Sequence, residues 1–366
     1  MKRRKFGYLA GLTVVSGCFA IACNNETPTI TSESSPTTTS ESSPQSTPVG
    51  STTTSGTLEK ELVIYSGRNE KLVGKLIQQF EQETGAKLQV RYGDTSELAA
   101  AILEEGANSK VDVFFAQDGG ALGAIQQAGR TIELPASLLD LVDSSYRSPE
   151  GKWLGITGRV RTVDYNTNLV KAAELPSSIF GFTEAKWKGK IGWAPTNGSF
   201  QSFVTALRVA EGEEKAKKWL EGIKANNPKV YSNNTSIVEA LSRGEISVGF
   251  VNHYYLEKIK QTNPKVPVEH HFTNDVGSLV NVAGVAILNT AKHPNIAKKF
   301  VEFMLSKDAQ NYFANETFEY PLVSGIAAKS NLKSLKEVKK QNQNIDLSNL
   351  KDLKATLQLM QQTQVL

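Results

Sequence analysis

The chain has 366 residues, of which 39% are hydrophobic, 21% are charged and only two are cysteines. Its formal net charge of +4 equals the four basic residues at positions 2–5, so the rest of the chain is close to neutral. It has no basic stripe with interleaved aromatic residues, which argues against nucleic acid as a partner. Cys18 and Cys23 both lie near the N-terminus, which excludes disulfides, thiol chemistry and thiolate metal sites from the later chain.

The first residues have the pattern of an export signal. A basic segment precedes residues 6–22, which are apolar but too few for a comfortable membrane span. We predict a lipoprotein-like signal peptide over 1–23 with Cys23 as the lipidated residue. Cys18 fits the same pattern, and an ordinary signal with incidental cysteines is the plainer alternative. Arg3 and Arg4 allow twin-arginine export besides the general route.

Residues 24–58 are rich in Ser, Thr and Pro. Such a segment buries too little apolar surface to fold, so we predict a disordered tether. The expected location is the periplasmic or cell-surface side of the cytoplasmic membrane, with a lipid anchor. About 300 residues remain, a length that suits two lobes.

The first half of this body alternates short apolar runs with helical periodicity. Because strands that alternate with helices pair in parallel through crossovers, this pattern predicts an α/β fold. The predicted strands are 62–65, 87–92 and 111–115, and the predicted helices are 69–84, 95–105 and 119–128.

The second half repeats a different unit, in which a strand leads into a small polar cluster and then a helix. Residues 157–165 alternate as an extended strand. Three later strands, at 190–194, 229–231 and 246–251, each precede a polar cluster and a helix start. Near the end, 282–288 predicts a strand, and 296–305 and 307–314 predict helices.

The three polar clusters could meet in one crevice, since ligands of open α/β sheets bind at the carboxyl ends of strands and helix N-termini attract anions. The plainer interpretation of each single cluster is a helix cap. Tyr254 and Tyr255 stand at the third junction. Two phenolates would suit Fe³⁺, a hard cation, although adjacent tyrosines also occur as ordinary core or surface residues.

Enzyme motifs are missing from the sequence. There is no Gly-x-Ser-x-Gly elbow, no His-Glu-x-x-His, no Walker loop and no dinucleotide-binding glycine motif. The four histidines form no spaced metal pair: His270 and His271 are adjacent in a predicted strand and face opposite ways. We therefore expect a binding protein and not an enzyme.

Several motifs, in this order and spacing, resemble the ferric-iron-binding substrate-binding proteins of ABC importers. This is the bacterial transferrin-like group of the periplasmic binding protein superfamily. The motifs are residues 63–68, 93–98, 111–116, 157–161, 195–199 and 251–255.

The resemblance implies site residues. It makes Tyr254 and Tyr255 the iron ligands, with a carbonate or another synergistic anion beside them. Tentative anion contacts are Arg159, Arg161, Asn197, Gly198, Ser199, Asn234 and Asn252.

The chain departs from the family on the other side of the site. Asn69 and Glu70 stand where members have a histidine and a tyrosine, Gln117 replaces a glutamate next to Asp118, and Phe200 replaces a third tyrosine. The possible contacts from this side, lobe 1 of the fold, are therefore Asn69, Glu70, Gln117 and Asp118, and Glu70 or Asp118 could complete the iron site.

The resemblance also implies the architecture, a two-lobed periplasmic-binding-protein fold. Each lobe is a mixed, mostly parallel sheet flanked by helices, and hinge strands join them. Lobe 1 would be 59–158 with 284–335, and lobe 2 would be 159–283 with 336–366. A monomer would capture ferric iron between the lobes and deliver it to an ABC permease in the inner membrane. The alternatives are a binder of a small anion or organic cation on the same scaffold and, more distantly, a secreted hydrolase.

Overall fold

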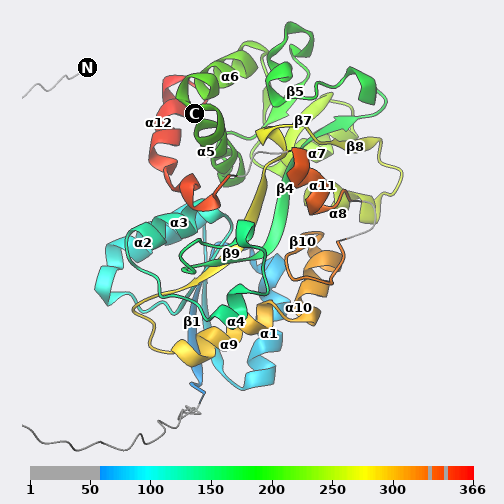
Figure 1. The fold of residues 1–366 in the computed structure, drawn as a ribbon. Helices are drawn as coiled ribbons and strands as arrows, with labels where there is room; N and C mark the ends of the chain where they lie inside the picture. The colour runs from blue at the N-terminus through cyan, green and yellow to red at the C-terminus, as the bar shows by residue number, and fades with distance from the viewer. Residues whose placement is uncertain (1–57, 329–331, 342–344) are drawn as a thin grey trace, which may run out of the picture. The chain divides into compact units, whose positions relative to one another are not determined.

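The computed structural model describes residues 58–328, 332–341 and 345–366. The predicted signal peptide, Cys23 and all but the last residue of the predicted tether lie outside this range. The folded body begins with the predicted alternation of strands and helices (Figure 1). Its first elements are β1 (Glu61–Ser66), α1 (Glu70–Thr84), β2 (Lys87–Tyr92), α2 (Thr95–Glu105), β3 (Val113–Ala116), α3 (Gly119–Gln127) and α4 (Ala136–Leu139).

The predicted parallel pairing of the first strands is confirmed. β1 pairs in parallel with both β2 and β3, and α1 buries Val73, Leu76, Ile77 and Phe80 at helical spacing. Asn69, Asp94 and Asp118 each cap the following helix by accepting a backbone N–H. The carboxyl ends of β1 and β3 therefore lie beside capped helix starts.

The second half contains β4 (Leu154–Asn166), β5 (Ile191–Trp193), α5 (Gly198–Glu211), α6 (Glu213–Ala225), β6 (Lys229–Val230), α7 (Asn234–Ser242), β7 (Val248–Asn252), α8 (Tyr254–Thr262) and β8 (Val268–His271). The remaining elements are β9 (Val280–Ile287), α9 (Pro294–Met304), α10 (Lys307–Tyr312), β10 (Tyr320–Pro321), α11 (Leu335–Gln341) and α12 (Leu353–Gln362). The sequence did not predict α6 and α12.

The long strand β4 connects the two halves of the sheet. Its first part, through Val160, pairs antiparallel with β9, while its second part, from Arg161, pairs antiparallel with β7 and β8. The strand order is β2-β1-β3-β9-β4-β7-β5-β6, with β8 and β10 paired to β4 off this path. In Figure 1, β4 and β9 run side by side between the two groups of helices.

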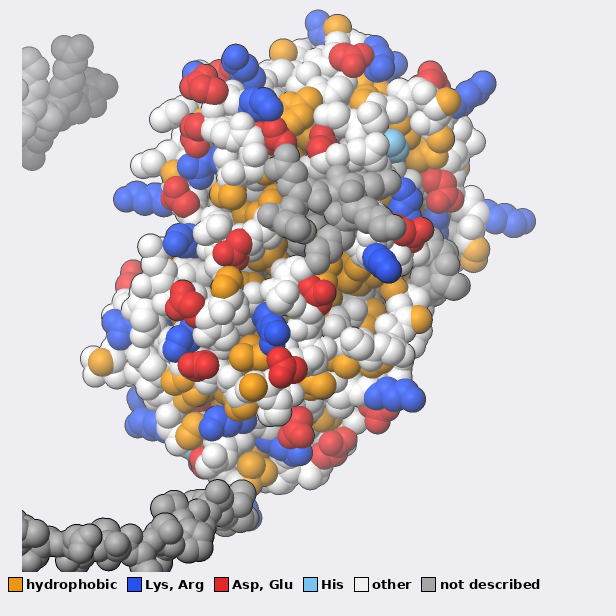
Figure 2. Space-filling view, viewed as in Figure 1, with side chains coloured by type: hydrophobic (Ala, Val, Ile, Leu, Met, Phe, Trp, Pro, Cys, Tyr) orange, Lys and Arg blue, Asp and Glu red, His pale blue; other side chains and the backbone are white. Residues whose placement is uncertain are grey.

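The main hydrophobic core extends over both halves of the sheet. Around β1 and β3, Phe80 packs edge-on against Phe300 at 5.2 Å between ring centroids. Around β5 and β7, the rings of Phe200, Phe203, Phe250 and Trp219 pack together. Phe200 is fully buried there, so it is a core residue of α5. On the face shown in Figure 2, acidic and basic side chains are interspersed, in line with the near-neutral charge.

The last segment lies against α3. A short 3-10 turn (Leu347–Lys351) approaches this helix so closely that a Cβ on Gly120 would stand 2.4 Å from the Leu350 carbonyl oxygen, and one on Gly123 would stand 2.5 Å from the Ser348 carbonyl oxygen. The glycine-rich start of α3 is thus required by packing. α12 then packs along α5, where the Thr205 and Thr356 hydroxyls hydrogen-bond at 2.8 Å.

Candidate metal centre

The junction between β7 and α8 holds the two tyrosines in contact. Only His253 separates the end of β7 from Tyr254, the first residue of α8. The Tyr254 hydroxyl donates to the Tyr255 hydroxyl at 3.1 Å, and the ring centroids are 4.3 Å apart. Burial, and after it the neighbouring Tyr254, raise the pKa of Tyr255. The Tyr255 phenol is therefore neutral in the protein without a bound cation, and a cation must displace its proton before the oxygen can act as an anionic ligand.

His253 fixes the start of the tyrosine helix. Its Nε2–H donates to the Phe318 carbonyl oxygen at 2.7 Å, and Nδ1 accepts the Val160 N–H at 3.2 Å. Burial, and then the nearby His270, lower the pKa of His253 to about 3. The ring is therefore neutral at ordinary pH, and both of its nitrogens are occupied by the backbone. This agrees with a structural role for His253.

A buried ion pair that the sequence analysis did not predict lies beside the tyrosines. Arg68, at the carboxyl end of β1, donates through Nη2 to Glu319, whose other oxygen accepts the Thr157 hydroxyl. Arg68 and Glu319 are each 1% exposed. Burial opposes the charge of Arg68, but Glu319 and Tyr254 outweigh it and raise the Arg68 pKa. Arg68 Nε and Nη1 have no hydrogen-bond partner among the described residues.

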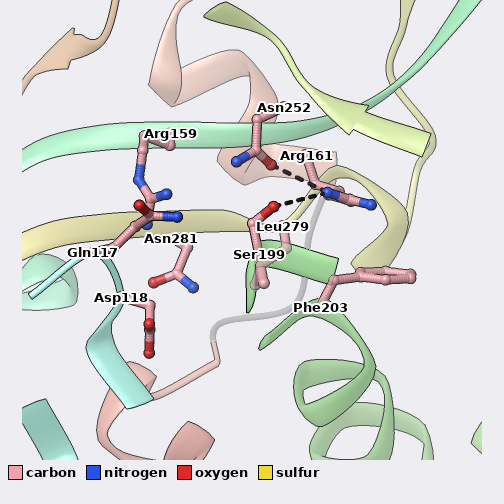
Figure 3. A pocket seen from close by; sticks show the side chains of 9 residues that line it. All are labelled: Gln117, Asp118, Arg159, Arg161, Ser199, Phe203, Asn252, Leu279 and Asn281. Atoms are coloured by element: carbon pink, nitrogen blue, oxygen red, sulfur yellow. Dashed lines mark hydrogen bonds between the residues drawn. The ribbon is translucent and has the colours of Figure 1, made fainter. Parts of the chain in front are cut away.

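Arg161 gathers the predicted anion-binding residues. Its Nη1 donates to Ser199 Oγ and to Asn252 Oδ1, each at 3.4 Å, as the dashed lines in Figure 3 mark. Asn234 Nδ2 in turn donates to Asn197 Oδ1 at 3.2 Å and to Ser199 Oγ at 3.4 Å. Clusters that follow three separate strands therefore meet, with Gly198 at the N-terminus of α5 between Asn197 and Ser199. Asn197 also caps α5, so here the cap and the cluster are the same residue.

Two buried arginines face a small cavity of about 20 Å³. Arg159 donates to the Val282 carbonyl oxygen at 3.3 Å, and its Nε and Nη1 have no partner within the described part of the chain. Burial lowers the pKa of Arg161 to about 9, against the opposing effect of the two tyrosines. Arg161 is therefore still mostly charged at neutral pH. The cavity is lined by Gln117, Asp118, Arg159, Arg161, Ser199, Phe203, Asn252, Leu279 and Asn281 (Figure 3).

The predicted lobe-1 contacts divide into two groups. Gln117 and Asp118 line this cavity, whereas Asn69 and Glu70 are exposed and do not. Asn69 accepts the Lys71 N–H at 2.9 Å as the cap of α1. Asp118 accepts the Ala121 N–H at 3.0 Å, and burial raises the pKa of its carboxyl group.

Asn281 is a further cavity residue that the sequence analysis missed. Its Oδ1 accepts the Gly119 N–H at 3.1 Å, and its Nδ2 donates to Ser202 Oγ at 2.9 Å. Asn281 thereby links β9 with α3 and α5. Asn281 is a polar residue within an otherwise apolar strand, and this feature of the sequence could have identified it as a candidate site residue.

Conventional metal clusters do not compete with the tyrosines. Within residues 58–328, 332–341 and 345–366, no group of three or more His, Cys, Asp or Glu side chains is placed to hold a metal ion. Over the same ranges, none of the helices is long and apolar enough to cross a membrane.

Comparison with known proteins supports the resemblance seen in the sequence. The major ferric iron-binding protein of Neisseria meningitidis serogroup B is 31% identical over 283 residues, covering 75% of this chain and 85% of that protein. The structure of iron-bound HitA from Pseudomonas aeruginosa matches with a TM-score of 0.78 and 31% identity, covering 83% of this chain and 99% of that one. A Trichodesmium protein (IdiA, FutA) in complex with iron and citrate matches with a TM-score of 0.70 and 30% identity, covering 83% and 99%.

These relatives are named for binding iron and not for catalysis, which agrees with the expectation that the chain is not an enzyme. Their structures also confirm the predicted α/β periplasmic-binding-protein fold. A family model described as bacterial extracellular solute-binding protein matches residues 75–340. The chain therefore belongs to the family of bacterial extracellular solute-binding proteins.

Proposed function

We propose that this protein captures ferric iron through Tyr254 and Tyr255. The observation that carries the proposal is the 3.1 Å contact between their hydroxyl oxygens at a strand-to-helix junction. Oxygen atoms this close can bind one cation together once their protons leave, and tyrosine oxygen is an established ligand of protein-bound iron. The iron-binding relatives support the same cargo.

The proposal includes a synergistic anion, because three buried arginines interact electrostatically with the tyrosines. Two phenolates cancel two of the three charges of Fe³⁺, while Arg68, Arg159 and Arg161 add three guanidinium groups. Of these three arginines, Arg68 is the one that forms an ion pair among the described residues, and its partner is Glu319. The unpartnered N–H groups of Arg159 and the Arg161–Ser199–Asn252 cluster are donors suited to a carbonate or carboxylate.

We further propose capture between two lobes and delivery to an ABC permease. The lobes would be 59–158 with 284–335 and 159–283 with 336–366, and the sharing of β4 between two sets of strands supports a hinge near its middle. Residues 347–351 contact α3 while α12 packs on α5, so this last segment touches both sides. The carrier would be a monomer held by a lipid on Cys23 and exported by the general or twin-arginine route.

A second candidate function is capture of a small anion or organic cation without metal. It is favoured by the positions of Asn69 and Glu70, which are exposed and do not line the cavity that holds Arg159 and Arg161. On this alternative, the donors around Arg159 and Arg161 would bind the ligand alone.

Titration of the purified protein with ferric citrate separates the two functions. Phenolate ligation of Fe³⁺ gives a visible charge-transfer band, which we expect in the wild type and not in the double variant Tyr254→Phe with Tyr255→Phe. Tyr231→Phe is the matched control, because the Tyr231 hydroxyl has no hydrogen-bond partner among the described residues. A colourless wild type, or equal iron binding by the double variant, would contradict the iron proposal.

A further inference from the structure

Three buried titratable side chains form a row beside α8, the helix that begins with the tyrosine pair. His270 Nδ1 lies 2.7 Å from Asp164 Oδ1, and His270 Nε2 lies 3.3 Å from Glu257 Oε1. The Asp164 side chain is fully buried, and those of Glu257 and His270 are 2% and 8% exposed. Neither the anion site nor the iron ligands proposed above involve these groups.

The row joins the central strands to the tyrosine helix. Asp164 on β4 is opposite His270 on β8 in the antiparallel register. Glu257 lies in the first turn of α8, three residues after Tyr254, and residues at this spacing share a helix face. His271 faces the other side of β8, where its Nε2 bonds the Pro176 carbonyl oxygen at 2.7 Å. Only one of the two adjacent histidines therefore reaches α8 through this row.

The start of α8 lacks the usual means of fixing a helix end. Its N-cap position, His253, is already helical and makes no side-chain capping hydrogen bond. The backbone before the tyrosines is held by His253, which bonds Phe318 and Val160. After the tyrosines, Glu257 in the first turn lies 3.3 Å from His270 at ion-pair distance. The two histidines thus bracket Tyr254 and Tyr255.

Stability alone is a weak explanation for such a row. Buried ion pairs often contribute no more to folding than apolar side chains of similar volume, since desolvation offsets their attraction. Burial would lower the pKa of His270, but Asp164 and then Glu257 outweigh it and raise the pKa to about 9. His270 is therefore a cation at neutral pH, paired with Asp164.

We infer that His270 is a positioning residue for the tyrosine pair. Its contact with Glu257 sets the orientation of the first turn of α8 and thereby the approach of the two phenol oxygens. The inference rests on the proposed iron site for its functional meaning, but the orientation of α8 can be tested without metal.

The central experiment compares His270→Gln with the matched control His271→Gln. Gln can keep a hydrogen bond to Asp164 but carries no charge. Loss of a group that orients a metal ligand typically lowers metal affinity by about 10–100-fold. We expect that decrease and a shifted charge-transfer band for His270→Gln, measured with ferric citrate, and wild-type values for His271→Gln. Wild-type affinity and band position in a folded His270→Gln would overturn the inference.

Glu257→Ala provides a second arm in case His270→Gln does not fold. This variant removes the contact with α8 but leaves His270 paired with Asp164, so no unpaired buried charge remains in the row. We expect weaker iron binding and a shifted band here too. An unchanged band and affinity would again overturn the inference.

Crystal structures of the variants without metal test the positioning role of His270 independently of the iron proposal. Should the wild type bind no iron, the proposed function fails, and the position of α8 still decides the inference. Loss of the 3.1 Å contact between the tyrosine hydroxyls in Glu257→Ala or His270→Gln, but not in His271→Gln, would support it. Retention of that contact in both row variants would overturn it.

Discussion

The two sides of the candidate centre offer different chemistry. On the side of α8, Tyr254 and Tyr255 present oxygens that become anionic ligands when their protons leave. On the side of β1 and β3, Arg68 supplies a fixed charge, and Gln117 and Asp118 supply polar groups at the cavity. On the proposed function, metal retention should therefore depend on the tyrosine side, while the side of Arg68, Gln117 and Asp118 should set the charge and the choice of anion.

Replacing either tyrosine should have the largest effect on binding. We expect Tyr254→Phe or Tyr255→Phe to lower iron affinity by more than the roughly 100-fold that loss of an outer-shell group can cause, because each removes a direct ligand. Competition with a chelator of known iron affinity measures the change. Equal affinity in either single variant would remove the asymmetry between the two sides.

Breaking the buried ion pair should act mainly on stability. Arg68→Gln leaves Glu319 buried without its cation, which costs about 3–5 kcal/mol of the free energy of unfolding. Urea denaturation measures it. Arg208→Gln is the control, because Arg208 pairs with half-exposed Glu213 and Asp352 and should cost less. An unchanged free energy of unfolding in Arg68→Gln would show that the ion pair with Glu319 does not hold Arg68 in place beside the tyrosines.

Acid should weaken the anchor of the tyrosine helix. Since His253 has a pKa lowered to about 3 from 6.5, the unfolded chain binds its proton first as pH falls. The stability that neutral His253 contributes is therefore present above about pH 6.5 and is lost progressively toward pH 3, by up to about 1.4 kcal/mol per pH unit. Denaturation of wild type and His253→Asn across this range should show a smaller pH slope in the variant. Equal slopes would contradict the assignment.

The smallest effect is expected at Asn69. Asn69→Ala removes the cap of α1 and should lower the free energy of unfolding by about 1 kcal/mol. Iron affinity should stay at the wild-type value, because the Asn69 side chain is exposed and is not among the residues that line the arginine cavity. A clear fall in iron affinity, measured together with the stability change, would indicate that Asn69 is a ligand and that both sides of the centre bind the metal.

Local patterns predict the parts of this molecule that depend on neighbours in sequence. The strand–helix alternation, the tyrosine pair and the polar clusters before α5, α7 and α8 could all be seen in short windows. Arg68 and Glu319 are 251 residues apart, and Asp164 and His270 are 106 apart, so no periodicity could join them. Asn69 lies at a motif position, yet its side chain serves the helix. A motif therefore identifies a candidate residue, but the contacts of its side chain depend on the folded structure.

Proton release on iron binding tests the central claim most directly. Both phenols must lose their protons to bind Fe³⁺. In weak buffer at neutral pH, each iron that the wild type takes from ferric citrate should therefore release two phenol protons, counted after correction for the protons that the freed citrate takes up, and the variant lacking both tyrosine hydroxyls should release neither. Iron binding by the wild type with no difference in proton release would show that the tyrosines are not the ligands.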